Sequence, residues 1–198
     1  NERIFEIPFA LQCVSSLPKG AQVLDLGCTE STLPLQLAAL GYRVMGYDFR
    51  EYPYRHPNLR FTQGDILALP FADDCYDAVC GISVIEHIGI GFYDDPRQGQ
   101  DADKKALDEI RRVLKTGGML ILTVPYGVAA TNEHHRIYDE TTLGRLLHGL
   151  QIQETRYFKS SFDFDTTCNA WVEISKAAAA TVQSDETAQG VCLIKAVK

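Results

Sequence analysis

Two carboxylates and a glycine turn are the residues of this chain whose types and spacing most clearly predict chemistry. Asp25 lies near the end of an apolar run, and Gly27 follows where the pattern changes from strand to helix. Asp48 ends a second apolar run. A helix that starts just after a strand points free N–H groups at a ligand, and a carboxylate at the tip of the next strand can accept both hydroxyls of a ribose. These residues predict a site for a nucleoside cofactor.

The spacing within the turn indicates which kind of nucleoside site this is. Residues 25–31 read Asp-x-Gly-x-Thr-x-Ser, with the acid two residues before the glycine. This pattern resembles the first motif of the class I S-adenosylmethionine-dependent methyltransferases, which has glycine at the positions of Thr29 and Ser31. Ser31 can still cap the following helix. The β-branched side chain of Thr29 is expected to crowd the methionine part of that cofactor.

A third acidic position extends the resemblance. Residues 59–66 look like a third strand ending in Gly64 and Asp65, and the resemblance implies that Asp65 accepts from the adenine amino group while Ile66 packs on the ring. The cofactor-binding set that it implies is Asp25, Gly27, Thr29, Ser31, Asp48, Phe49, Gly64, Asp65, Ile66 and Ser83.

Later segments match the same family in register. Residues 71–80 are similar to its approach to the fourth strand, residues 81–88 to the segment that leaves this strand, and residues 109–125 to a helix, a Gly-Gly turn and a fifth strand. The resemblance runs from about residue 23 to about residue 157. Each motif is weak alone, but five in register are specific.

Three histidines fall on one predicted rim. His87 follows the fourth strand, and His134 and His135 follow the fifth. Methyl transfer to a hydroxyl is helped by a base with a pKa near neutrality, for which histidine is best suited. We therefore take these three histidines as the catalytic candidates. The alternative is that His87 caps a helix or touches the cofactor, and that the later pair only holds its loop.

A metal site is the sharper variant of this hypothesis. Glu86, His87 and His134 offer oxygen and nitrogen ligands suited to Mn²⁺, Mg²⁺ or Zn²⁺. The pair Glu86-His87 resembles the metal site of small-RNA 3′-terminal 2′-O-methyltransferases, but Ser83 stands where those enzymes have a further glutamate. Asp94 and Asp95 would replace it only if their loop folded inward. The sequence therefore favours a site without a resident metal.

The elements that must position these residues alternate between strand and helix. This βαβ pattern predicts a mostly parallel sheet. The resemblance implies an α/β, Rossmann-like, doubly wound sheet of seven strands with helices on both faces and an antiparallel last strand. We expect strands near 21–26, 43–48, 59–63, 77–82, 118–124, 150–157 and 190–197, and helices near 4–17 with an interruption at Pro8, 32–40, 102–115, 140–149 and 171–182.

We expect one domain over residues 1–198, in which residues 1–20 form a helical cap over the cofactor. The segments 89–101 and 126–139 are too long or too polar to be simple connectors, and both follow strands at the carboxyl edge of the sheet. We interpret them as loops of the active site, the first as a substrate lid.

Composition limits the partners. The 198 residues carry a net charge of −7 with no basic stripe, which argues against a nucleic-acid substrate. Arg60, Arg97, Lys104 and Lys105 are candidates for recognising one phosphate or carboxylate, and the favoured alternative is that they are solvated surface charges. No stretch approaches the roughly 20 apolar residues of a membrane span, and no leader is seen, although Asn1 in place of methionine indicates that preceding residues are missing. The six cysteines are scattered, as in reduced cytoplasmic proteins.

The sequence therefore predicts S-adenosylmethionine-dependent O-methylation of a sugar or another small hydroxylated molecule. The pattern also resembles uncharacterised bacterial methyltransferases associated with polysaccharide or sugar modification. One alternative is a protein of the same fold that has lost catalysis, for which Thr29 is the best support. A nicotinamide oxidoreductase is disfavoured, because the turn lacks the spacing G-x-G-x-x-G and no Tyr-x-x-x-Lys pair is present.

Overall fold

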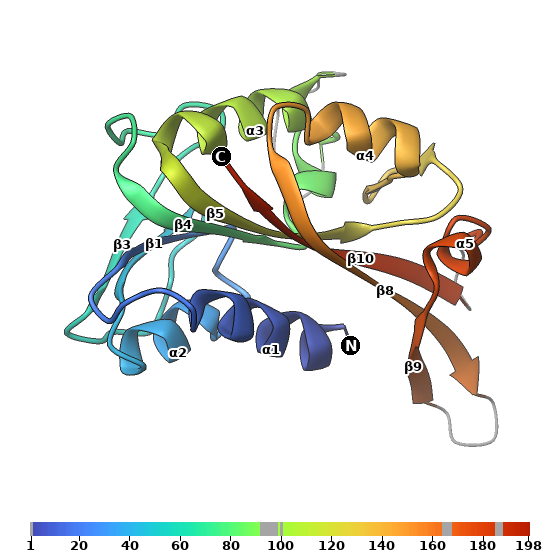
Figure 1. The fold of residues 1–198 in the computed structure, drawn as a ribbon, viewed down its shortest axis with the longest axis horizontal. Helices are drawn as coiled ribbons and strands as arrows, with labels where there is room; N and C mark the ends of the chain where they lie inside the picture. Colours follow the sequence, from blue (N-terminus) through green and yellow to red (C-terminus); the bar gives the residue numbers. More distant parts are fainter. Residues whose placement is uncertain (1, 92–98, 100, 164–167, 185–187) are drawn as a thin grey trace.

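One large sheet organises the molecule (Figure 1). The computed structural model describes residues 2–91, 99, 101–163, 168–184 and 188–198. Within these ranges, eight strands form the sheet in the order β3-β2-β1-β4-β5-β10-β8-β9. Their bounds are β1 Gln22–Leu26, β2 Arg43–Asp48, β3 Leu59–Gln63, β4 Tyr76–Ile82, β5 Leu114–Pro125, β8 Gln151–Asp163, β9 Cys168–Ile174 and β10 Ala188–Val197.

The strand directions confirm the predicted fold class. Strands β1 to β5 pair in parallel, whereas β10 is antiparallel to both of its neighbours, β5 and β8. The apolar runs of the central strands β1 and β4 are buried, with six of the seven residues of β4 buried, whereas β3 at the sheet edge has no buried residue. Parallel strands covered on both faces need such runs.

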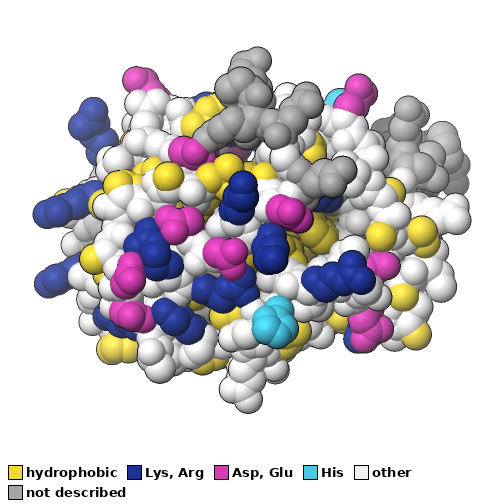
Figure 2. All heavy atoms as spheres, turned by 90° about the horizontal axis from the view of Figure 1, so that it is seen from above, with side chains coloured by type: hydrophobic (Ala, Val, Ile, Leu, Met, Phe, Trp, Pro, Cys, Tyr) yellow, Lys and Arg dark blue, Asp and Glu magenta, His cyan; other side chains and the backbone are white. Residues whose placement is uncertain are grey.

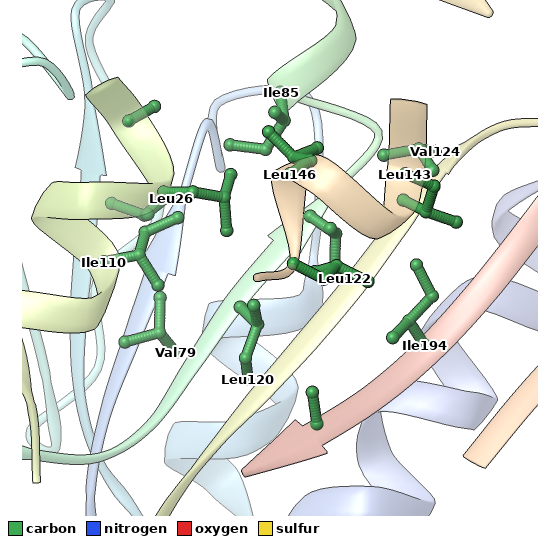
Figure 3. Close-up of a cluster of buried hydrophobic side chains, with 14 of the residues drawn as sticks. Leu26, Val79, Ile85, Ile110, Leu120, Leu122, Val124, Leu143, Leu146 and Ile194 are labelled. Carbon is green, nitrogen blue, oxygen red and sulfur yellow. The ribbon is translucent and has the colours of Figure 1, made fainter. Parts of the chain in front are cut away.

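Helices cover the two faces of the sheet. The helices α1 (Arg3–Val14) and α2 (Leu33–Ala39) lie on one face, and α3 (Ala102–Val113) and α4 (Glu140–Leu146) lie on the other (Figure 1). Because strand side chains alternate, neighbouring residues of β1 enter different cores. Leu24 and Leu26 join the core under α3 and α4, shown in Figure 3, and Val23 joins the core under α1 and α2.

The C-terminal third corrects one prediction. Residues 171–182 were expected to be helical, but residues up to Ile174 belong to β9, an eighth strand, and only Lys176–Ala179 form a helix, α5. Trp171 packs edge-on against Phe5 of α1, at 5.0 Å between ring centroids. This tertiary contact and the β-forming residues Val172 and Ile174 override the helical tendency of the alanines that follow.

Pro8 lies inside α1 and does not interrupt it, which is a second correction. Pro8 is the sixth of the twelve residues of α1, where its ring removes one hydrogen bond and crowds the carbonyl four residues earlier. The burial of Phe9, Ala10, Cys13 and Val14 against the sheet offsets this cost. No helix in the described part of the chain is long and apolar enough to cross a bilayer.

The surface over α3 and α4 carries basic and acidic side chains side by side (Figure 2). A cavity of about 940 Å³ lies there, bordered by residues of α3, of α4 and of the segment 129–138. Lys104 lines this cavity. Arg60 and Lys105 are exposed elsewhere, and Arg97 is outside the described residues.

Candidate active site

The turn after β1 brings backbone close to β4. Gly27 has φ 63° and donates its N–H to the carbonyl of Tyr47 at 2.8 Å. A Cβ at Gly27 would lie 2.4 Å from Cγ2 of Val84, just after β4. Only glycine satisfies both the positive φ and this close approach. Ser31 Oγ accepts from the N–H of Leu33 at 3.1 Å, so this serine does satisfy a free donor at the start of α2.

Asp25 lies beside this turn with one oxygen lacking a partner. The residue is 2% exposed, and Oδ2 has no hydrogen-bond partner among the described residues. Burial raises the pKa of Asp25 to about 8, while the charge of Arg3 works in the opposite direction. A buried carboxyl oxygen without a donor is costly, so a donor from a ligand would stabilise it.

Asp48 holds the turn through backbone amides. Its Oδ2 accepts from Thr29 N–H at 2.9 Å and its Oδ1 from Arg50 N–H at 3.0 Å. Each carboxylate oxygen has a second lone pair, so these bonds leave acceptor capacity. Thr29 is not among the residues with positive φ, and its hydroxyl donates to the carbonyl of Arg50 at 3.3 Å. Threonine in place of glycine therefore leaves the backbone of this turn unstrained.

The predicted adenine side lies at the ends of β2 and β3. Gly64 donates its N–H to the carbonyl of Asp48 at 2.9 Å, and a Cβ there would meet the hydroxyl of Tyr47 at 2.0 Å. Asp65 Oδ1 accepts from Leu67 N–H at 2.9 Å, and Ile66 packs partly buried against the core. Phe49, by contrast, is 46% exposed at the rim. The strand ends thus place an exposed ring, a carboxylate and glycine backbone at one edge.

The three histidines separate into two roles. The rings of His87 and His135 meet edge to face, 6.2 Å apart between centroids. His134 contributes its carbonyl, 2.6 Å from Nδ1 of His87, while its own ring is largely exposed. A carbonyl only accepts, so Nδ1 of His87 carries the proton and Nε2 is the basic nitrogen. Burial lowers the pKa of His87, which keeps the ring neutral at pH 7.

The two predicted loops are joined by one arginine. Arg136 donates to the carbonyl of Ile88 at 2.6 Å and to that of Gly99 at 3.4 Å. It lies in the strand β7 (Arg136–Ile137), which pairs with β6 (Ala130–Thr131). Asn132 Oδ1 accepts from the amides of both His134 and His135. The second loop is therefore a small hairpin that carries the histidine pair.

The described residues do not assemble the alternative metal set. Glu86 Oε1 lies 3.8 Å from Nε2 of His87, in the short 3₁₀ helix η1 (Ile85–His87), but the ring of His134 is paired with Glu133 at 3.3 Å. Within these described ranges, no group of three His, Cys, Asp or Glu residues could hold a metal. Asp94 and Asp95, and most of the predicted lid 89–101, lie outside them.

Glu86 is expected to make stability depend on pH. It is 2% exposed, and burial raises its pKa from an ordinary 4.5 to about 8. Between these values the folded protein keeps a proton that the unfolded chain loses, so the free energy of unfolding falls as pH rises, by up to about 1.4 kcal/mol per unit. Glu86→Gln removes this contribution. Denaturant titrations of both proteins at pH 5 and pH 8 should show the variant gaining stability over wild type at pH 8. Parallel pH curves would contradict the expectation.

The sequence alone did not indicate two residues of α1 that reach this edge. Glu6 is fully buried, and its Oε1 accepts from the hydroxyls of Ser83 and Thr123, both at 2.7 Å. Arg3 donates to Glu6 Oε2 at 3.1 Å and to the carbonyl of Ile82 at 2.8 Å. The sequence did contain a signal for Glu6, which lies on the same side of the first helix as Phe9. Because buried charged residues are rare unless they are paired, a charge on the apolar side of a helix indicates a buried partner.

Comparisons with known proteins show the family of this chain. Residues 24–122 match the family model described as a methyltransferase domain. The chain is 31% identical to the demethylmenaquinone methyltransferase of Thermus thermophilus over 189 residues, which cover 87% of this chain and 80% of that protein. It is 35% identical over 117 residues to the enzyme of the same name from Renibacterium salmoninarum, covering 57% of this chain and only 44% of that protein.

A solved structure shares the fold over almost the whole chain. The 1,6-didemethyltoxoflavin-N1-methyltransferase of Burkholderia thailandensis, determined with its substrate and S-adenosylhomocysteine, has a TM-score of 0.68. The match covers 98% of this chain and 78% of that chain, at 17% identity.

Proposed function

Because this chain belongs to the class I S-adenosylmethionine-dependent methyltransferases, we propose that it methylates a hydroxyl group of a small acceptor such as a sugar. The observation that carries the proposal is His87. Its proton lies on Nδ1, against the carbonyl of His134, and its pKa is lowered. A neutral imidazole with a basic Nε2 at the carboxyl edge of the sheet suits removal of a hydroxyl proton.

The described residues fit the cofactor. Among the described residues, the buried Oδ2 of Asp25 has no donor, and Gly27, with φ 63°, forms the tight turn before α2. Asp48 lies at the tip of β2 for the ribose, with Asp65, Ile66 and Phe49 at the neighbouring strand ends for the adenine. When bound, the cofactor supplies an electrophilic methyl group. The protein's task is alignment of the acceptor oxygen with that methyl group, which is worth about 7–11 kcal/mol.

A second candidate acceptor comes from the relatives. Demethylmenaquinone is the substrate in the names of proteins up to 37% identical to this chain. The longest of these matches covers 80% of the relative, but the match to the Renibacterium protein covers less than half of it. Demethylmenaquinone should therefore be assayed beside sugar acceptors, with and without Mn²⁺ or Mg²⁺.

Thermal unfolding with S-adenosylhomocysteine tests the cofactor. At ligand about 100-fold above its Kd, we expect about 2.7 kcal/mol of added stability, which is roughly 5–10 °C in Tm for a domain of this size. NAD at the same concentration should leave Tm unchanged. No shift with either ligand, confirmed by calorimetry, would favour a scaffold that has lost catalysis, whereas a shift with NAD would overturn the cofactor assignment.

A further inference from the structure

The carboxyl end of β4 is held in an unusual conformation by contacts from α1 and β5. Ser83, the residue directly after β4, has φ 50°, a region that residues other than glycine seldom adopt. Its N–H donates to Thr123 Oγ1 at 3.0 Å and to the carbonyl of Thr123 at 3.2 Å. Its hydroxyl donates to Glu6 at 2.7 Å. These three bonds explain why the conformation persists.

Glu6 is the acceptor in all of its side-chain hydrogen bonds with the described residues. Both of its oxygens accept: Oε1 from the two hydroxyls of Ser83 and Thr123, and Oε2 from Arg3 at 3.1 Å. Burial raises the pKa of Glu6, while the charge of Arg3 and the two hydroxyl donors work in the opposite direction. In the ionised form, paired with Arg3, the carboxylate cannot donate, so both hydroxyl protons point at it. A serine hydroxyl has one proton and two lone pairs. Since that proton is committed to Glu6, Ser83 can offer only lone pairs to anything else that it contacts.

Ser83 lies where the methionine end of the cofactor is expected. It is half-buried, and its neighbour Val84 packs directly on Gly27, in the turn that the family uses to approach that part of the cofactor. Asp25 lies near the carboxyl end of β1, beside Gly27, and its Oδ2 has no hydrogen-bond partner among the described residues. The chemical group at this end that needs acceptors is the α-ammonium, which has three N–H donors and a positive charge.

We propose that Glu6 is a positioning residue that fixes the direction of the Ser83 hydroxyl, so that Ser83 presents an acceptor to the α-ammonium group of the cofactor. This inference rests on the proposed function, because it needs the cofactor at this edge. The first helix would then contribute to the preference for ligands that carry the amino-acid end of the cofactor. Glu6 does not touch the cofactor and acts through Ser83.

The test compares two ligands by isothermal titration calorimetry. S-adenosylhomocysteine carries the ammonium group, and 5′-methylthioadenosine lacks the whole amino-acid end. In Glu6→Gln the amide can donate to Ser83 and reverse its hydroxyl. We expect the affinity for S-adenosylhomocysteine to fall about 10-fold or more, as for a lost hydrogen bond to a charged group, and the affinity for 5′-methylthioadenosine to stay within about twofold.

A double-mutant cycle tests whether Glu6 acts through Ser83. Ser83→Ala should show the same selective loss, and Glu6→Gln should cost nothing further when added to Ser83→Ala. Glu2→Gln is the matched control, since it removes a charge from the same end of α1 without touching Ser83. It should change neither affinity.

Several outcomes would overturn the proposal: an equal loss for both ligands, additive effects in the cycle, or the same selectivity change in Glu2→Gln. If Glu6→Gln does not fold, Ser83→Ala decides, because an unchanged preference for S-adenosylhomocysteine in that variant excludes the assignment and a selective loss supports it. Failure of wild type to bind either ligand would instead refute the proposed function.

Discussion

Replacing His87 with alanine is expected to lower kcat for methyl transfer by about 10²- to 10⁴-fold, the usual contribution of a general base. S-adenosylhomocysteine should still raise Tm, because we assign the ring to the acceptor and not to the cofactor, and the lost hydrogen bond to the His134 carbonyl should cost only about 1 kcal/mol of folding stability. The lowered pKa of His87 adds a second signature. The acidic limb of the kcat/KM profile should lie below the ordinary histidine pKa of 6.5 and disappear in the variant.

The neighbouring histidines provide the controls for this experiment. His134 holds His87 through its backbone carbonyl, so His134→Ala should retain most of the activity. His148, exposed at the end of α4, should be replaceable by alanine without effect. Equal losses in His87→Ala and His134→Ala would show that the loop, and not an imidazole, carries the effect. Full activity of His87→Ala would remove the base from the proposal.

Gly27→Ala is expected to cost about 2–4 kcal/mol of folding stability and to abolish the Tm shift with S-adenosylhomocysteine. The new Cβ would lie 2.4 and 2.7 Å from the two methyl carbons of Val84, so Val84 or the turn must shift. Overpacking costs about 1–3 kcal/mol, and the positive φ adds about 1 kcal/mol. Denaturant unfolding and the ligand-induced shift measure the two effects.

Gly20→Ala separates strain from overpacking. Gly20 also has a positive φ, 85°, but a Cβ there would meet nothing within 4 Å. This variant should lose only about 1 kcal/mol and keep the full ligand shift. If both variants lost the same stability and both kept the shift, the close approach of Gly27 to Val84 would have no role in binding.

The elements that the sequence predicted well are those specified by local pattern. Apolar runs marked β1, β2 and β4, and Gly27 after β1 and Asp48 at the end of β2 marked the carboxyl edge. The eighth strand was missed because the segment around Trp171 is stabilised by a tertiary contact with Phe5, which no local pattern encodes. The backbone of Thr29 does not need a positive φ, whereas the predicted crowding of the cofactor by its side chain stays a prediction.

The histidines show the same limit at the level of side chains. Their positions after β4 and β5 placed His87, His134 and His135 on one rim. The sequence could not show that His134 contacts His87 through its backbone carbonyl, whereas His135 does so through its ring. For Glu6 the limit is distance along the chain. Its partners are 77 and 117 positions away, so their pairing could not be inferred from spacing.

That separation has a consequence for how the protein folds. Residues 24–122, which match the family model, contain Ser83 but neither Glu6 nor Thr123. The β4 end can therefore reach its final conformation only after the first helix has docked on β5, a contact of very high sequence separation. Closing such loops is slow. We expect cofactor affinity to be among the last properties gained during refolding, after most of the secondary structure has formed.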